Sequence, residues 1–349
     1  MTEIDQAAGD EVEEPKSSLH ILRILPIVII LGLLVHFVLP RIDTISAAVE
    51  TLQTMKPWAV AFAFLMEALS YAANGALLQS IVSLMGERIS LRRSVAIEAG
   101  AATVAIVAAG ALGFGASIYR WTRNGGISQR TAMLASWLPS VFDSITLIVF
   151  ALLSAASLLF RHVGLSRTTL VALVIVMSAL VAVIGTIIVL LARNEWLIAI
   201  STGAAHVIQK VRPSLDDVRF VETAHRAAET WRSLKRGGWI RPGLSSILVL
   251  TFDLLSFRYA LLAAGQHPHF TVVLAGYGVP LLLGRASFIP GGIAVTEVAM
   301  AAILTALGIP GAAAVVSVLV YRLISFWIPS LIGIPIAVTL QATKREAQA

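Results

Sequence analysis

The chain has 349 residues, of which 57% are apolar and only 13% charged, about half the charged share of a soluble globular domain. A water-soluble fold could not bury that much apolar surface, and the mean hydropathy of +0.85 comes from uncharged stretches long enough to cross a bilayer. The absence of cysteine excludes disulfides, thiolate metal sites and cysteine nucleophiles. Basic residues are spread over connecting segments and form no continuous basic face, so nucleic acid is not an expected partner.

The N-terminus is predicted to be a disordered acidic tail over 1–18, because six of the first fourteen residues are acidic. The apolar run 22–39 is too long for the hydrophobic region of a signal peptide and lacks a basic leader. We therefore expect it to be a retained first span of a membrane domain covering 19–340. A short basic tail, 341–349, would follow in the cytoplasm.

The remaining apolar segments predict an all-α membrane protein. They lie at 57–85, 94–118, 131–160, 168–192, 242–263, 271–289, 293–308 and 312–340. Glycine and proline interrupt 94–118 and 271–308, which frees backbone groups that lipid cannot satisfy, so both must lie inside the bundle. The prediction is about six full spans plus two broken, re-entrant elements.

The distribution of charge predicts the orientation of these elements. The net positive stretches 86–93 and 119–130 favour the cytoplasm, so 94–118 would enter and return at one face. The loop 193–241 holds nine basic and five acidic residues, favours the same side, and contains a predicted amphipathic helix at 215–236. A cytoplasmic C-terminus then requires 271–308 to re-enter from the opposite face.

A weak internal repeat is compatible with two inverted halves. Ala116-Ser117 followed by Gly125-Gly126-Ile127 recurs as Ala286-Ser287 followed by Gly291-Gly292-Ile293. In transporters built from inverted repeats, the site lies at the midplane between broken helices. Coincidence in a sequence rich in glycine and alanine is the alternative.

Ionisable side chains within the spans are the main functional signal, because each costs about 2.5–3.5 kcal/mol at the centre of a membrane helix. These side chains are Glu67, Glu98, Asp143, Asp253, Arg258, Arg285, Glu297 and Arg322. The three arginines lack an acidic partner at helical i,i+4 spacing, so their partners must come from other helices or from a ligand. For Glu67 and Glu98 we expect buried ion pairs between helices.

Arg285 is the strongest candidate for binding an anionic head group. It precedes Phe-Ile-Pro-Gly-Gly, at the break between two half-helices where amides and helix N-termini favour phosphate. The hypothesis is that a phosphate is held by two arginines and two glycine amides, with carboxyl groups balancing charge or carrying protons. The phosphate ligands would be Arg285, Arg322, Gly291 and Gly292, and the carboxyl groups Glu297, Asp253 and Asp143, with Arg258 as a further binding residue.

Arg120 and Arg123 end the first broken segment and could gather anionic head groups at the cytoplasmic face; ordinary positive-inside anchoring is the alternative. Enzyme signatures are absent: the chain has no Walker loop, no His-Glu-x-x-His and no Gly-x-Ser-x-Gly. The close pair His267 and His269 is interpreted as a polar turn. No catalytic residue, metal or cofactor is expected.

Three motifs in the C-terminal part carry a resemblance to a known family: Pro290-Gly-Gly-Ile-Ala-Val-Thr-Glu297, Ala-Leu-Gly-Ile-Pro310 and Val-Tyr321-Arg322-Leu-Ile-Ser-Phe-Trp-Ile-Pro329. Through these motifs the chain resembles the lysylphosphatidylglycerol synthase transmembrane-region family, also called flippase-like. It is specific over 276–333 and looser over 55–265. One departure is Ala294, where the family usually has glycine.

The resemblance implies movement of a lipid or lipid-linked molecule across the inner, or cytoplasmic, membrane. In well-known members a soluble domain transfers lysine to phosphatidylglycerol, and the membrane region moves the product outward. That domain is expected to be missing here, so synthase activity is not implied. The partner would be a membrane lipid; the alternatives are an accessory subunit of a phospholipid or hopanoid biosynthesis enzyme, and a membrane-embedded lipid transferase.

Overall fold

The computed structural model describes residues 50–107, 111–160, 238–287 and 289–346, with the isolated positions 178 and 182. Every regular element in this part of the chain is helical, and four helices are long and apolar enough to cross a membrane. The protein is therefore a polytopic all-α membrane protein, as predicted. The acidic tail, the first expected span, the span at 168–192 and the helix at 215–236 lie outside the described residues.

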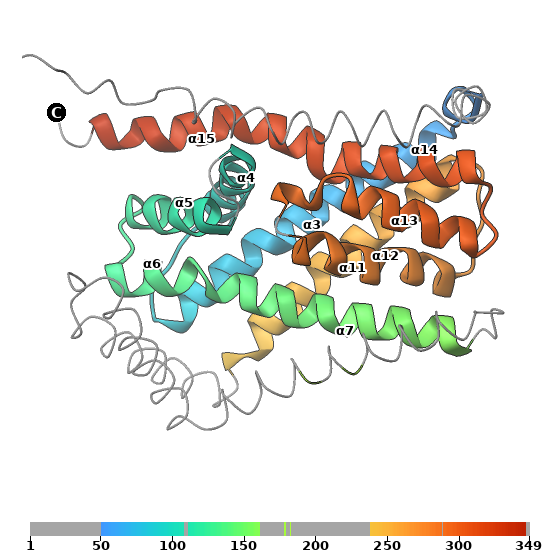
Figure 1. Cartoon of the computed structure of the whole chain (residues 1–349). Coiled ribbons are helices and arrows are strands. Elements are labelled where there is room, and N and C mark those ends of the chain that lie inside the picture. The colour runs from blue at the N-terminus through green and yellow to red at the C-terminus, as the bar shows by residue number, and fades with distance from the viewer. Residues whose placement is uncertain are drawn as a thin grey trace, which may run out of the picture. The chain divides into compact units, whose positions relative to one another are not determined.

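Two long antiparallel helices, α3 (Pro57–Leu84) and α11 (Ile240–Ala263), pack along each other (Figure 1). Small side chains allow the close packing, and Ser70 Oγ donates to the carbonyl of Val249 at 3.0 Å. The helices meet at one end, where the Lys56 amide donates to the Ala263 carbonyl at 2.9 Å. We call this end of the molecule the Lys56 end.

The other end of α3 is tied to a second loop, and we call it the Glu87 end. The Glu87 carboxylate accepts hydrogen bonds from the Ser128 amide at 2.8 Å, from the Ser128 hydroxyl at 2.6 Å and from the Thr131 hydroxyl. Ser128 is also the N-cap of α6 (Gln129–Ala135). The segments 86–93 and 119–130 therefore lie on the same side, as predicted from their charge.

These bonds make the Glu87 loop sensitive to acid. Hydrogen bonds from Ser128 and Thr131 lower the pKa of Glu87 below its ordinary value. A lowered folded-state pKa gives stability that is present above the unfolded-state value and is lost as pH falls through the folded-state value. We expect Glu87→Gln to lower the melting temperature in detergent at pH 7 and to differ little from wild type below about pH 3. An equal deficit at both pH values would contradict this assignment.

The first broken element is the hairpin of α4 (Leu91–Val107) and α5 (Ala111–Arg123), which enters and leaves at the Glu87 end. Trp121 is buried at its base against Ile97 and Ile118, and Gly100 leaves room for the indole, because a Cβ there would lie 3.0 Å from it. The chain continues through α6 into α7 (Leu138–Phe160).

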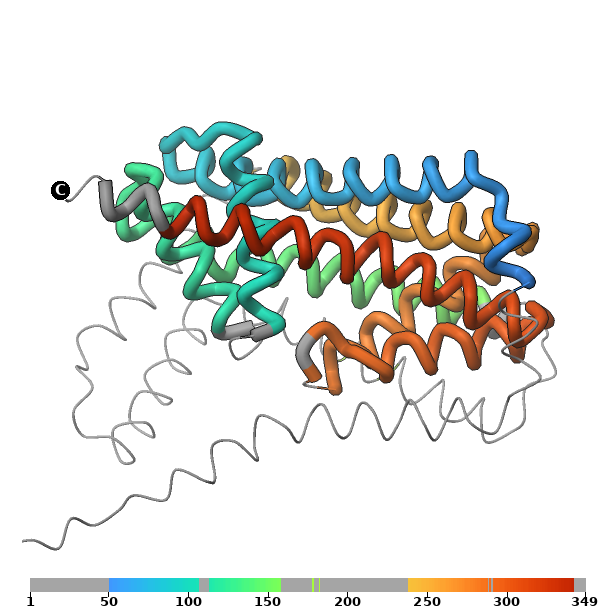
Figure 2. The backbone as a smooth tube through the Cα atoms, turned by 90° about the horizontal axis from the view of Figure 1, so that it is seen from above, coloured from blue at the N-terminus to red at the C-terminus, as the bar shows by residue number. Residues whose placement is uncertain are grey.

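The second broken element enters from the Lys56 end. It consists of α12 (Phe270–Ala286), the short 3-10 turn η3 (Pro290–Gly292) and α13 (Val295–Ala306). Gly278 lets α12 approach α7, since a Cβ there would lie 2.7 Å from the Phe150 carbonyl oxygen. α4 contacts η3, so the first hairpin meets the break of the second (Figure 2). The two hairpins thus enter the bundle from opposite ends, the arrangement expected of two re-entrant elements of opposite orientation.

The C-terminal part returns from the Lys56 end to the Glu87 end. It begins with α14 (Gly311–Arg322), passes through a π-helical turn, η4 (Leu323–Trp327), and ends with α15 (Ile328–Glu346). Ala337 packs in the same cluster as Trp121, which places the end of α15 beside α5. The π turn directly follows Arg322, and such turns often occur at functional sites.

The motif repeat noted in the sequence is wrong in its register. Gly291-Gly292-Ile293 forms the break inside the second hairpin, whereas Gly125-Gly126-Ile127 follows α5 at the Glu87 end. The two hairpins are inverted because they enter the bundle from opposite ends, and the two glycine motifs do not occupy equivalent places in them.

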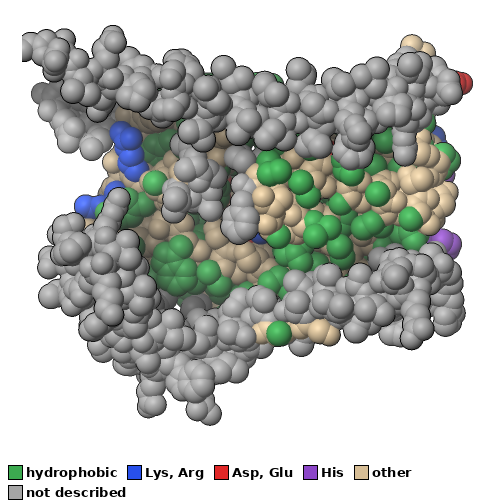
Figure 3. All heavy atoms as spheres, in the orientation of Figure 1, with side chains coloured by type: hydrophobic (Ala, Val, Ile, Leu, Met, Phe, Trp, Pro, Cys, Tyr) green, Lys and Arg blue, Asp and Glu red, His purple; other side chains and the backbone are tan. Residues whose placement is uncertain are grey.

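The face of the molecule in Figure 3 follows the expected pattern for a bilayer. Lys and Arg side chains gather towards the Glu87 end, a histidine lies at the other end, and hydrophobic side chains fill much of the described surface between them. Many large apolar side chains on the long helices are exposed, including Phe62, Leu244, Leu319 and Val338. Exposed apolar surface of this extent fits contact with lipid.

Candidate functional site

A cavity of about 280 Å³ lies within the bundle and collects most of the intramembrane charges. Seven α-helices contribute to its lining, α3, α4, α5, α7, α11, α12 and α14, together with the π-helical turn η4. The ionisable side chains that line it are Glu67, Tyr71, Glu98, Asp143, Asp253, Arg285, Tyr321 and Arg322. The cavity thus brings together charged side chains from segments that lie far apart in the sequence.

The first ion pair joins the second hairpin to α7. Arg285 Nη2 lies 2.5 Å from Asp143 Oδ2, and the exposed fractions of the two side chains are 46% and 19%. Arg285 is the last-turn residue of α12, so its cation also offsets the partial negative charge of that helix end. Because nearly half of Arg285 is accessible, its guanidinium can take another acceptor besides Asp143.

The second ion pair is enclosed by protein. Arg322 Nε donates to Glu297 Oε1 at 2.6 Å, and Arg322 Nη2 donates to the Gly291 carbonyl at 2.7 Å. The guanidinium carbon also lies 4.5 Å from the ring centroid of Phe326, and only 7% of the Arg322 side chain is exposed. Arg322 therefore holds the break of the second hairpin in place, while bordering the cavity.

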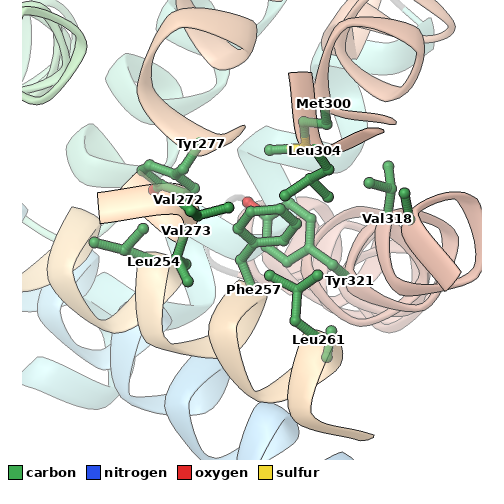
Figure 4. Packing of buried hydrophobic residues seen from close by; sticks show 12 residues of the cluster. Leu254, Phe257, Leu261, Val272, Val273, Tyr277, Met300, Leu304, Val318 and Tyr321 are labelled. Carbon is green, nitrogen blue, oxygen red and sulfur yellow. The ribbon is translucent and has the colours of Figure 1, made fainter. Parts of the chain in front are cut away.

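Asp253 is held by two phenols. The Tyr277 hydroxyl donates to Oδ2 at 2.7 Å and the Tyr321 hydroxyl donates to Oδ1 at 2.8 Å. The ring of Phe257 packs against both tyrosines (Figure 4). Its centroid lies 6.3 Å from the ring centroid of Tyr277 and 5.1 Å from that of Tyr321. Neither tyrosine was among the predicted site residues, although Tyr277 lies between two glycines of a broken span and Tyr321 precedes Arg322.

The ion pairs expected for Glu67 and Glu98 are not found among the described residues. Glu67 is 6% exposed and Glu98 is 5% exposed, and each keeps one carboxyl oxygen without a hydrogen-bond partner. Both line the cavity. The two arginines of the cavity, Arg285 and Arg322, pair instead with Asp143 and Glu297.

Gly291 and Gly292, whose amides were predicted to bind phosphate, make hydrogen bonds within the protein. The Gly292 amide donates to the Ile289 carbonyl at 2.8 Å, and Gly291 offers its carbonyl to Arg322. Neither glycine lines the cavity. The turn thus uses the Gly292 amide to close itself, and the role of this amide as a phosphate ligand stays a prediction.

Ala294 carries an unusual backbone. Its φ of 70° and ψ of −40° lie close to the classic γ-turn, which is rare and strained for a residue with a Cβ. It is the only non-glycine residue with positive φ among the described positions. The substitution of the family's usual glycine thus strains the start of α13, rather than changing how closely two helices approach.

The remaining predicted binding residues do not border the cavity. Arg258 lies near the Lys56 end, with its guanidinium 5.9 Å from the ring centroid of Phe270. Arg120 and Arg123 end α5 at the Glu87 end, where Arg123 Nη1 donates to the Ile127 carbonyl at 2.9 Å. Their positions suit anchoring at the membrane surface.

The fold and the cavity define a class: polytopic helical membrane proteins with two oppositely oriented re-entrant hairpins around a charged interior. The chain belongs to the lysylphosphatidylglycerol synthase TM region family, whose model matches residues 23–333. It is 29% identical over 230 residues to a UPF0104 membrane protein of Pyrococcus horikoshii, covering 62% of this chain and 66% of the relative. A UPF0104 membrane protein of Methanothermobacter thermautotrophicus is 33% identical over 88 residues, covering 25% of this chain and 26% of the relative. The chain thus spans just under two thirds of the first relative's length and about a quarter of the second's.

Proposed function

We propose that this protein moves a lipid or lipid-linked molecule with a phosphate-bearing head group between the leaflets of the cell membrane. The observation that carries the proposal is the Arg285–Asp143 pair, which is partly accessible and lies at the cavity between two oppositely oriented broken hairpins. Broken helices at a midplane site are the arrangement by which secondary transporters expose a site to alternate sides.

The head group would bind chiefly at Arg285. Arginine is the side chain best suited to bidentate phosphate binding, and Arg285 can exchange Asp143 for phosphate oxygens. Arg322, enclosed by Glu297 and the Gly291 carbonyl, would keep the turn in place as the hairpins move. The acyl chains would remain in the bilayer, because a cavity of about 280 Å³ suits a head group and not a whole lipid.

The orientation follows from the charges at the two ends. Arg88, Arg123 and Arg241 lie at the Glu87 end, while the Lys56 end holds fewer basic side chains among the described residues. From the positive-inside bias we propose that the Glu87 end, and with it the C-terminal end of α15, faces the cytoplasm.

Reconstitution of the purified full-length protein tests this function. Liposomes with a fluorescently labelled phosphatidylglycerol should show protein-dependent movement of label between leaflets, measured by dithionite quenching. Arg285→Ala should reduce the rate at least tenfold and Arg285→Lys less, whereas Arg92→Ala, on the exposed surface of α4, should not change it. The proposal would be defeated if the wild-type protein moved neither this lipid nor other phospholipids. It would also be defeated if mass spectrometry detected a new lipid species made by the protein.

A further inference from the structure

The cavity is lined by more carboxyl groups than arginines. Two arginines are each paired with one acid, and among the described residues three carboxyl groups remain near them without a cation: Glu67, Glu98 and Asp253. Ionising all three at hydrocarbon depth would leave a net charge of about −3 in a site that solvates anions poorly. Some of this charge must be cancelled by a species that enters the cavity.

Two of these carboxyl groups lie on helices that pack along each other. Glu67 on α3 and Asp253 on α11 both line the cavity. Both oxygens of Asp253 already accept from tyrosine hydroxyls, so Asp253 is the better stabilised anion. Glu67 is 6% exposed, lines the cavity, and has one oxygen without a partner. Two neighbouring carboxyl groups in such surroundings hold one proton between them.

A proton fits this pair better than a metal ion does. No three His, Cys, Asp or Glu side chains in the described residues are grouped so that they could hold a metal ion. The groups that line the cavity around the pair, or donate to Asp253, offer hydroxyls, one carboxamide, two further carboxyl groups and the two paired cations. By element they are Tyr71 and Asn74 on α3, Glu98 on α4, Asp143 on α7, Tyr277 and Arg285 on α12, and Tyr321 and Arg322 on α14.

We propose that Glu67 and Asp253 form a proton-binding site that exchanges through the cavity and couples proton movement to the cargo step. The coupling rests on the proposed lipid transport; the proton site does not. A head group that binds Arg285 would release Asp143 from its ion pair and add negative charge to the cavity. Proton uptake at the neighbouring carboxyl pair would offset that charge, and proton release on the other side would reset the site.

The proton site is tested without transport. Infrared difference spectra of wild-type protein and Glu67→Gln in lipid should show a protonated carboxyl absorption in the wild type at pH 7 that the variant lacks. Asp253→Asn should shift this band, and Glu50→Gln, at an exposed position near the start of the described chain, should leave it unchanged. A spectrum in which Glu67→Gln removes no protonated carboxyl would overturn the proposal.

The coupling is tested in the liposome assay. A pH gradient should change the wild-type rate of lipid movement at least threefold, and Glu67→Gln, which is fixed in a neutral form, should move lipid at a rate independent of the gradient. Replacing sodium by choline should have no effect; sodium dependence, or a wild-type rate indifferent to pH gradients, would overturn the coupling. Wild-type protein that moves no lipid would defeat both the proposed function and the coupling, whereas the infrared band would still decide the proton site.

Discussion

Replacing Arg322 by Met is expected to lower the free energy of unfolding by about 3–5 kcal/mol, the usual cost of removing one partner from a buried ion pair. The loss arises because Glu297 and the Gly291 carbonyl would both remain buried without their donor. The measurement is the unfolding equilibrium of the purified protein in mixed micelles of detergent and SDS.

A double-mutant cycle separates the pair from simple loss of packing. Glu297→Gln alone should cost less, because glutamine can still accept a hydrogen bond from Arg322. The double variant should be at least about 1 kcal/mol more stable than the sum of the single effects predicts, because neither partner then leaves an unpaired charge. Strict additivity would show that the two side chains do not stabilise each other.

Replacing Gly292 by Ala is expected to cost about 2–5 kcal/mol, from an unfavourable backbone conformation and from overpacking. The φ of Gly292 is +61°, and a Cβ there would lie 2.8 Å from the Gly284 Cα and 2.7 Å from the Thr296 hydroxyl. Backbone at the end of α12 cannot move aside as a side chain can. The same change should also slow lipid movement, because the added methyl group would displace the turn η3, whose Gly291 carbonyl binds Arg322.

Gly308 provides the matched control. It also has a positive φ, +91°, but a Cβ there would meet nothing within 4 Å. Gly308→Ala should therefore cost only the backbone part, about 1–2 kcal/mol. Equal losses at the two positions, measured in the same micelle titration, would show that the close approach of η3 to α12 contributes nothing.

The sequence by itself determined that this protein lies in a lipid bilayer, and it determined the outline of the fold. Long uncharged segments can be satisfied only by lipid, and glycine and proline within 94–118 and 271–308 leave backbone groups that must be buried in protein. Charge in the connecting segments then gave opposite orientations to the two broken elements, because basic loops resist translocation. These constraints are local, or act through the bilayer, so a linear sequence expresses them.

Only the tertiary structure decided which charges are partners. Arg285 lies 142 residues from Asp143, and the paired oxygen and nitrogen atoms meet only because α12 packs on α7. The two tyrosines on Asp253, the enclosure of Arg322 and the unpaired oxygens of Glu67 and Glu98 likewise depend on side-chain directions across helices. Helical spacing fixes neighbours at three and four residues, but long-range partners depend on how whole helices pack, and that packing turns a list of buried charges into a site.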